Sequence, residues 1–265
     1  MGFDNFTRKI GYQYYYGMNE YNNKKDYDGN WGIFDEPFLQ YCVKQIDTLT
    51  KPFHAAFFTL SSHHPYAMPE EHKNKFSKGT LIVHETVSYT DYALKRFFNE
   101  ASKCDWFENT LFLITSDHSG LTESKDFKTQ LGLFKIPMII YHPKMKSNIV
   151  STQFVQQIDV YPTIIDMLNI ENEKIFTFGR SPFSEKEKYY IYYTNGEYLL
   201  MIGNYLSKYK QDGTIELFDV EKDQTLKNNI ANQQQEITKK HIRFTQAFIQ
   251  QYNNTIIENT TTISK

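Results

Sequence analysis

An aspartate and a histidine stand side by side in the motif SDHSG at 116–120, directly after the apolar run at 110–115. A carboxylate next to an imidazole, followed by small residues, can hold a divalent metal ion from a tight turn. The apolar run has the length and composition of a buried strand, and open α/β sheets bind ligands at the carboxyl ends of their strands. Asp117 and His118 are therefore candidate metal ligands, with a purely structural loop pair as the alternative.

A second histidine, His63, follows another apolar run, at 53–60. An imidazole in that place can donate to a phosphate oxygen or bind a metal ion, and the alternative is a loop histidine hydrogen-bonded to backbone. Adjacent parallel strands lie about 4.8 Å apart, so two such strands would bring the rings of His63 and His118 into one crevice, within ~12 Å of each other. We expect the neighbouring His64 to point away from it.

No residue of the sequence stands out as a catalytic nucleophile. Hydroxyl groups occur near the candidate site at Ser61, Ser62 and Ser116. None of them has an evident activating base close by in the sequence, which a serine nucleophile requires. We therefore assign no catalytic residue in this chain.

The composition is that of a soluble globular protein of 265 residues, with 40% hydrophobic and 23% charged residues. A net charge of −2 gives no electrostatic case for a nucleic-acid partner. Cys42 and Cys104 are isolated, and we expect free thiols. No apolar run approaches the ~20 residues that span a membrane, and no signal-peptide pattern opens the sequence. The chain as given is expected to be soluble.

Buried strands alternating with amphipathic helices indicate an α/β fold, a three-layer sandwich with a mostly parallel sheet flanked by helices. Apolar runs predict adjacent strands, and periodic segments predict helices between and after them. The strands are expected near 53–60, 110–115 and 136–141, and the helices at 35–46, 84–102 and 159–169.

From about residue 186 the pattern changes to shorter strands with Asn-Gly and Asp-Gly turns, followed by a helix, which indicates a small C-terminal α+β portion. The expected strands are 189–193, 198–202 and 216–219, and the expected helix is 232–252. We divide the chain into three parts: residues 1–185, which the resemblance described below identifies as the C-terminal part of a catalytic domain, residues 186–252, the small portion of the same domain, and residues 253–265, a polar tail.

Several segments resemble the alkaline phosphatase and sulfatase superfamily. The motif at 116–120 is similar to its DHG element, with Ser119 standing before the glycine here. A proline at 137 opens the next strand, as in that superfamily, and DVYPTIID at 159–166 looks like its DxxPTxxD helix. Two more segments complete five elements in the same order: FGRSPF at 178–183, and LFD at 217–219 with Asp223 and Asn228-Asn229.

Three segments are similar to lipoteichoic acid synthases and related phosphoglycerol transferases, and the resemblance covers about residues 1–230. The segment TLSSHHPY at 59–66 resembles their TLSNHxPF, with Ser62 in place of the asparagine. The other two are YTDYALKRF at 89–97, which resembles YxDxALxxF, and GFDNF at 2–6, which resembles GYDxF.

The resemblance implies a metal-dependent phosphoglycerol transferase of the sulfatase-like family. Asp117 and His118 would ligate manganese, with magnesium, zinc or calcium as alternatives, and His63 would contact the phosphate of the phosphoglycerol group. The substrate would be a phosphoglycerol-bearing lipid or glycan. The alternatives are a sulfatase or phosphodiesterase-type hydrolase, and a non-catalytic fragment of the fold.

The resemblance also implies that part of the family's site lies outside this chain. In the family, a threonine nucleophile, a glutamate and a substrate-binding tryptophan and arginine precede the GYDxF segment, and Trp31 and Arg8 are not their equivalents by position. We therefore expect this chain to be inactive alone, with membrane contact only through a missing N-terminal segment. The full-length parent would act at the extracytoplasmic face of a bacterial cell membrane.

Overall fold

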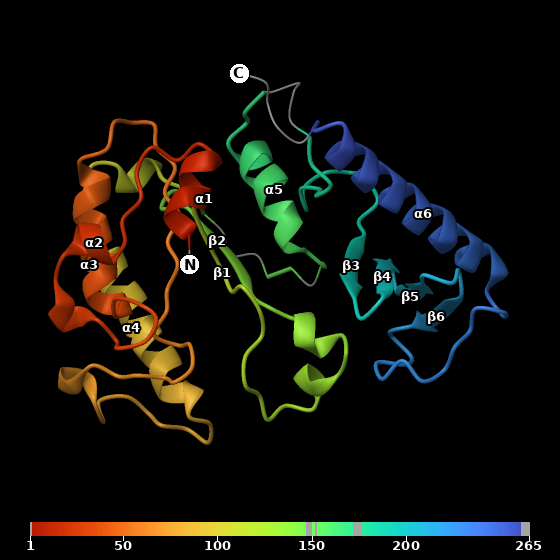
Figure 1. Cartoon of the computed structure of the whole chain (residues 1–265), viewed down its shortest axis with the longest axis horizontal. Coiled ribbons are helices and arrows are strands. Elements are labelled where there is room, and N and C mark those ends of the chain that lie inside the picture. Colours follow the sequence, from red (N-terminus) through yellow and green to blue (C-terminus); the bar gives the residue numbers. More distant parts are fainter. Residues whose placement is uncertain (1, 147–149, 152, 172–175, 261–265) are drawn as a thin grey trace. The chain divides into compact units, whose positions relative to one another are not determined.

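The computed structural model describes residues 2–146, 150–151, 153–171 and 176–260 (Figure 1). The chain forms two compact units. The first comprises Met1–Glu123 and Ile139–Lys146, and the second comprises Ser124–Met138 and Ser147–Lys265. Among the described residues, no helix combines the length and the apolar character needed to cross a membrane.

The first unit is built on two long helices and a two-stranded sheet. The helices predicted at 35–46 and 84–102 are confirmed, as α3 and α4, and two of the predicted strands are confirmed as the neighbours β1 and β2. The elements are α1 (Phe3–Lys9), α2 (Met18–Tyr21), α3 (Asp35–Asp47), α4 (Val83–Ala101), β1 (Phe112–Thr115) and β2 (Met138–Tyr141).

Helices α3 and α4 pack because each carries an apolar face with helical spacing. On α4 the buried residues Ala93, Phe97 and Ala101 recur every four positions and therefore lie on one side. They join residues of α3 and the segment after α4 in one core: Leu39, Val43, Ile46, Trp106 and Phe107. The first unit therefore has a hydrophobic core of its own.

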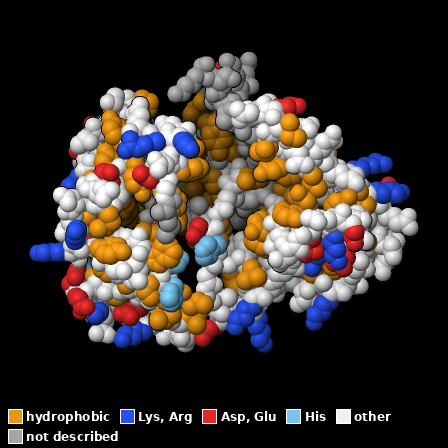
Figure 2. All heavy atoms as spheres, in the orientation of Figure 1, with side chains coloured by type: hydrophobic (Ala, Val, Ile, Leu, Met, Phe, Trp, Pro, Cys, Tyr) orange, Lys and Arg blue, Asp and Glu red, His pale blue; other side chains and the backbone are white. Residues whose placement is uncertain are grey.

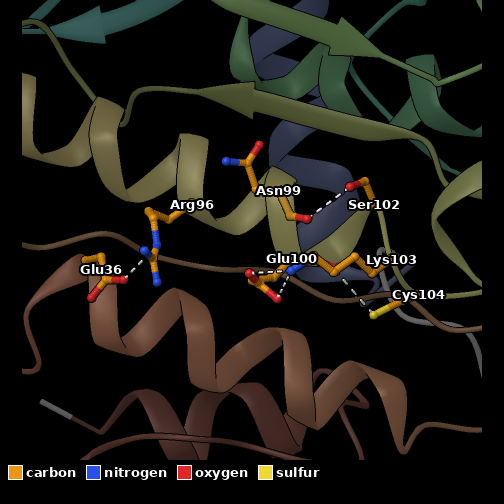
Figure 3. Close-up of polar contacts among 7 residues, drawn as sticks. All are labelled: Glu36, Arg96, Asn99, Glu100, Ser102, Lys103 and Cys104. Atoms are coloured by element: carbon orange, nitrogen blue, oxygen red, sulfur yellow. Dashed lines mark hydrogen bonds and ion pairs between the residues drawn. The ribbon is translucent and has the colours of Figure 1, made fainter.

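Polar contacts border the α3–α4 packing (Figure 3). Arg96 Nε on α4 lies 3.4 Å from Glu36 Oε1 in the first turn of α3. Lys103 Nζ lies 2.8 Å from each carboxylate oxygen of Glu100. The lysine and arginine side chains are about half exposed or more, so these pairs add little stability, and the apolar core carries the packing.

The prediction of a strand at 53–60 is wrong for this structure. The segment is assigned to no strand, and no segment that the structure describes pairs with it as a β-ladder. Phe53 and Ala55 pack against the core of the first unit, whereas Phe57 and Phe58 are 40% and 56% exposed. A short apolar run indicates burial, but a strand also requires a neighbouring strand with which to bond.

The two cysteines are free, as predicted. Cys42 is buried on α3, and this burial raises the pKa of its thiol to about 12. Since the thiolate is the reactive form, Cys42 is inert at neutral pH. It acts as a small apolar residue of the helix face.

The second unit contains a four-stranded antiparallel sheet in the order β3-β4-β5-β6, with α6 lying beside the strands (Figure 1). The predicted strands and helices of this region are confirmed, while β5 was not predicted. The elements are α5 (Val160–Met167), β3 (Tyr190–Thr194), β4 (Glu197–Ile202), β5 (Tyr205–Lys210), β6 (Ile215–Asp219) and α6 (Gln235–Ile257).

The turn between β3 and β4 is the Asn-Gly pair expected from the sequence. Asn195 and Gly196 have φ values of 50° and 82°, as a two-residue hairpin turn of type I′ requires. The strand residues then alternate between two cores, because side chains of a strand point to opposite faces. Leu200 and Ile202 pack with Phe244 and Phe248 of α6. The other face packs a second set: Leu199, Met201, Leu206, Phe218, Leu131 and Phe134.

Helix α6 continues to Ile257, five residues into the segment expected to be a polar tail. The last five positions of that segment, 261–265, lie outside the described residues. The buried residues of the helix are Thr238, His241, Thr245 and Thr255, which lie on one side of it. The apolar and threonine-rich face explains why the helix extends beyond 252.

The stability of the protein should fall in mild acid because of His241. The side chain is 1% exposed, with Nδ1 2.9 Å from Ser207 Oγ, and burial lowers its pKa from 6.5 to about 4. The unfolded chain takes up this proton from about pH 6.5 and the folded chain only near pH 4, so stability falls as the pH falls through that window. The difference corresponds to about 3 kcal/mol.

Urea unfolding followed by circular dichroism at pH 7.5 and pH 4.5 measures this loss. The matched control is His241→Gln, which keeps a polar side chain opposite Ser207 but does not titrate. We expect a smaller loss of stability in the variant than in the wild type. Equal losses in the two proteins would exclude His241 as the cause.

Candidate metal and phosphate site

The loop after β1 places the Asp117 and His118 side chains next to each other. Asp117 Oδ1 accepts a hydrogen bond of 2.9 Å from the His118 backbone N–H. Its other oxygen, Oδ2, lies 3.4 Å from His118 Nε2. The side chains are 53% and 70% exposed, so both are accessible to a ligand from solution.

A backbone carbonyl fixes the tautomer of His118. Its Nδ1 lies 2.8 Å from the Ser119 carbonyl oxygen, which can only accept, so Nδ1 carries the proton. In the neutral ring the lone pair is then on Nε2, which faces Asp117 Oδ2. Metal-ligating histidines are usually held in this way, with the second ring nitrogen donating to a carbonyl or carboxylate.

The spacing of the pair fits a single divalent cation. Two acceptor atoms that lie 3.4 Å apart repel each other unless a proton or a cation lies between them. Ligands that each lie ~2.1 Å from one tetrahedral ion are themselves separated by about 3.4 Å. Among the described residues, no group of three or more His, Cys, Asp or Glu side chains gathers as a metal site. By itself the pair could supply only part of a coordination shell.

His63 lies in the turn after the 53–60 segment and is oriented in a similar way. Its backbone N–H donates to the Leu60 carbonyl at 3.0 Å, and its Nδ1 lies 2.8 Å from the His64 carbonyl oxygen. The Trp31 ring packs on the imidazole with centroids 4.1 Å apart. The bond from Nδ1 to the backbone is the one expected in the alternative interpretation, a loop histidine hydrogen-bonded to backbone. This bond does not occupy the other ring nitrogen, Nε2.

Asp35 is the residue near this site that the sequence interpretation missed. It is the first residue of the predicted helix at 35–46, and it is 2% exposed. Its carboxylate accepts hydrogen bonds from Leu60 N–H at 2.8 Å, Ser61 N–H at 3.1 Å and the Thr90 hydroxyl at 2.6 Å. The donors lie 25, 26 and 55 positions away, so no local pattern identifies them.

Ser61 has a structural part in this arrangement. It is 3% exposed, and its Oγ accepts a hydrogen bond of 3.0 Å from the Asp35 backbone N–H. A buried hydroxyl bound in this way is not available as a nucleophile.

Both candidate loops belong to the first unit. That the rings of His63 and His118 face one crevice, within ~12 Å of each other, stays a prediction. Figure 2 shows histidine side chains, in pale blue, at the surface of the face in view, among scattered apolar side chains in orange.

Comparison with known proteins finds one family and one fold. Residues 1–170 match the family described as Sulfatase. Lipoteichoic acid synthase 1 of Bacillus subtilis (strain 168) is 27% identical over 213 residues, which are 74% of this chain and 33% of that protein. Lipoteichoic acid synthase of Staphylococcus aureus (strain USA300) is 24% identical over 213 residues, with the same coverage. The chain thus spans about a third of the length of these relatives.

Solved structures confirm the predicted alkaline-phosphatase-like α/β fold. A protein in the alkaline phosphatase superfamily from Vibrio parahaemolyticus has a TM-score of 0.65 at 21% identity, covering 78% of this chain and 51% of its own. Phosphonate monoester hydrolase of Agrobacterium radiobacter has a TM-score of 0.54 at 12% identity, covering 83% and 60%. At these identities the likeness concerns the fold alone.

Proposed function

The chain belongs to the sulfatase family, and from this premise we propose that it is part of a metal-dependent phosphoglycerol transferase. The Asp117–His118 pair, with Oδ2 and Nε2 3.4 Å apart, is the observation that carries the proposal. The similarity to two lipoteichoic acid synthases supports a phosphoglycerol-bearing lipid or glycan as the substrate. We propose manganese as the ion, and the extracytoplasmic face of a bacterial membrane as the location of the parent protein.

Asp117 and His118 would hold the ion, which when bound neutralises charge on the phosphate. The Asp117 carboxylate supplies a negative oxygen, and the carbonyl of Ser119 keeps the His118 Nε2 lone pair available as the second ligand. The two side chains therefore bind and orient, and neither transfers a proton while it is a ligand.

His63 would contact an oxygen of the substrate phosphate through Nε2. Since Nδ1 donates to the His64 carbonyl, Nε2 carries a hydrogen only when the ring is the imidazolium. A charged donor to a phosphate oxygen makes a stronger hydrogen bond than a neutral one. In its imidazolium form, His63 would donate from Nε2 to the phosphoglycerol group.

Phosphoglycerol transfer also needs an in-line nucleophile. We propose that it comes from sequence outside these 265 residues, because the chain spans about a third of its relatives and Ser61 is buried in a structural role. Release of glycerol phosphate from a phosphatidylglycerol analogue, with manganese, tests this for the chain alone and for a longer protein that contains it. Robust turnover by the 265-residue chain would overturn this part of the proposal. Transfer to water only would indicate a hydrolase instead.

In the longer protein, His63→Ala should lower kcat/KM about 10- to 100-fold and leave manganese affinity unchanged, because its partner is phosphate. Loss of a hydrogen bond to a charged group costs ~1.5–3 kcal/mol. The same glycerol-phosphate assay and calorimetric titration with manganese measure the two effects. His64→Ala is the matched control, since it removes the adjacent imidazole and keeps the backbone carbonyl. Equal losses in both variants would contradict the role of His63.

A further inference from the structure

We propose that Asp35 and Trp31 are positioning residues for His63. Asp35 fixes the backbone turn that carries the histidine, and Trp31 fixes the orientation and tautomer of its ring. Together they present Nε2 to the ligand. The inference rests on the proposed role of His63 in phosphate binding, and it adds the residues on which that role depends.

Asp35 connects the start of α3 to the His63 turn in both directions. Its Oδ1 accepts from the backbone N–H groups of Leu60 and Ser61, while its own backbone N–H donates to Ser61 Oγ. Oδ2 accepts from the hydroxyl of Thr90 on α4. The carboxylate is buried. Its negative charge is stabilised by the three hydrogen-bond donors and by the N-terminal end of a 13-residue helix.

These bonds matter for the turn because the preceding segment has no strand partner among the described residues. Without a β-ladder, Leu60 and Ser61 depend on Asp35 for their backbone positions. The Leu60 carbonyl then accepts the His63 N–H at 3.0 Å, which closes the turn. A displacement of Leu60 therefore reaches the histidine directly.

Trp31 acts on the ring itself. Its Nε1–H donates to the His64 carbonyl oxygen at 2.7 Å, and His63 Nδ1 lies 2.8 Å from that same oxygen. A carbonyl oxygen has two lone pairs, so it accepts both bonds. Trp31 thereby holds the carbonyl in place for His63, while its ring packs on the imidazole at 4.1 Å.

Trp31 is in turn held by the loop that precedes α3. Asp28 Oδ1 accepts hydrogen bonds from the backbone N–H groups of Trp31, at 2.8 Å, and Gly32, at 3.0 Å. A Cβ atom at Gly32 would lie 2.7 Å from Leu60 Cδ1, so this loop lies against the Leu60 side chain of the His63 turn. One short stretch, 28–35, thus contacts both the backbone and the ring.

The test measures the tautomer of His63 in the chain at pH 8 by long-range nitrogen–proton NMR, with the signal assigned from His63→Gln. The wild type should show the proton on Nδ1. Trp31→Phe, which keeps an aromatic ring but loses the N–H donor, and Asp35→Asn, which keeps the shape but loses the charge, should both shift the ratio toward Nε2–H. Loss of one hydrogen bond changes such a ratio about 2- to 12-fold.

His64→Gln is the control, because the carbonyl belongs to the backbone and should keep the wild-type tautomer. If Asp35→Asn does not fold, Thr90→Val replaces it as a milder variant, because it leaves the backbone bonds to Asp35 in place. We expect Thr90→Val to shift the tautomer ratio less than Trp31→Phe does. An unchanged tautomer in folded Trp31→Phe together with folded Asp35→Asn or Thr90→Val would overturn the inference.

A titration with glycerol phosphate separates this inference from the proposed function. Two results together would support both the positioning inference and the phosphate role of His63. The tautomer would change in the Trp31 and Asp35 variants, and the His63 signals of the wild type would shift on addition of glycerol phosphate. If the dependence is present but the His63 signals ignore glycerol phosphate, the positioning inference holds and the phosphate role fails.

Discussion

Asp117→Asn and His118→Ala should each abolish metal-dependent glycerol-phosphate release in a longer protein that carries the nucleophile. Both variants should also weaken manganese binding by the 265-residue chain. The expected loss of turnover is about 10³-fold or more, because a bound ion supplies several kcal/mol of transition-state stabilisation. The loss of affinity should exceed the ~10- to 100-fold that outer-shell changes cause. Calorimetric titration with manganese and the glycerol-phosphate assay measure the two effects.

The physical reason lies in the geometry of the pair. Asp117→Asn keeps the side-chain shape but replaces a negative oxygen with a neutral amide, which removes the charge that attracts the cation. His118→Ala removes Nε2, the atom that lies 3.4 Å from Asp117 Oδ2. Asp105→Asn is the matched control, since Asp105 is an exposed carboxylate that pairs with Lys51. Manganese binding that survives in Asp117→Asn, or falls equally in the control, would contradict the metal assignment.

The two candidate loops differ in how far the sequence predicts them. The candidate metal pair is local: Asp117, His118 and Ser119 are consecutive, and their mutual contacts need only the turn after β1. The environment of His63 is not local, since Trp31 donates a hydrogen bond across 33 positions and Asp35 accepts hydrogen bonds across 25 and 26 positions. A motif therefore indicates the candidate metal ligands, but not the residues that contact the turn and the ring of His63.

The same distinction explains the fold. Helices α3 and α4 were predicted because their apolar spacing is a property of each segment alone. The 53–60 run was wrongly predicted as a strand, because its apolar composition says nothing of a pairing partner. Strand β5, Tyr205–Lys210, was missed because Ser207, Lys208 and Lys210 make it read as polar, whereas its pairing with β4 and β6 buries Leu206 and Ser207. Tertiary context outweighs intrinsic β-propensity there.

Phe97→Ala should destabilise the first unit by about 3–5 kcal/mol, the range for truncating a buried aromatic ring. The side chain is 3% exposed, and its ring lies 5.7 Å from Phe57, 5.4 Å from Phe98 and 6.4 Å from Phe112, measured between centroids. Phe112 begins β1, the strand that leads to the candidate metal ligands Asp117 and His118. Urea unfolding followed by the fluorescence of Trp106, which lies in the same core, measures the loss.

Val87→Ala is the matched control, because Val87 lies on the same helix and is 51% exposed. The free energy of unfolding of the Val87→Ala variant should stay within about 0.5 kcal/mol of the wild-type value, as for most surface substitutions. If Phe97→Ala unfolds at the same urea concentration as Val87→Ala, the α3–α4 core does not determine the stability of this unit. A large loss for Phe97→Ala with reduced manganese binding near its unfolding midpoint would show that the core holds the loop after β1 in its ligating form.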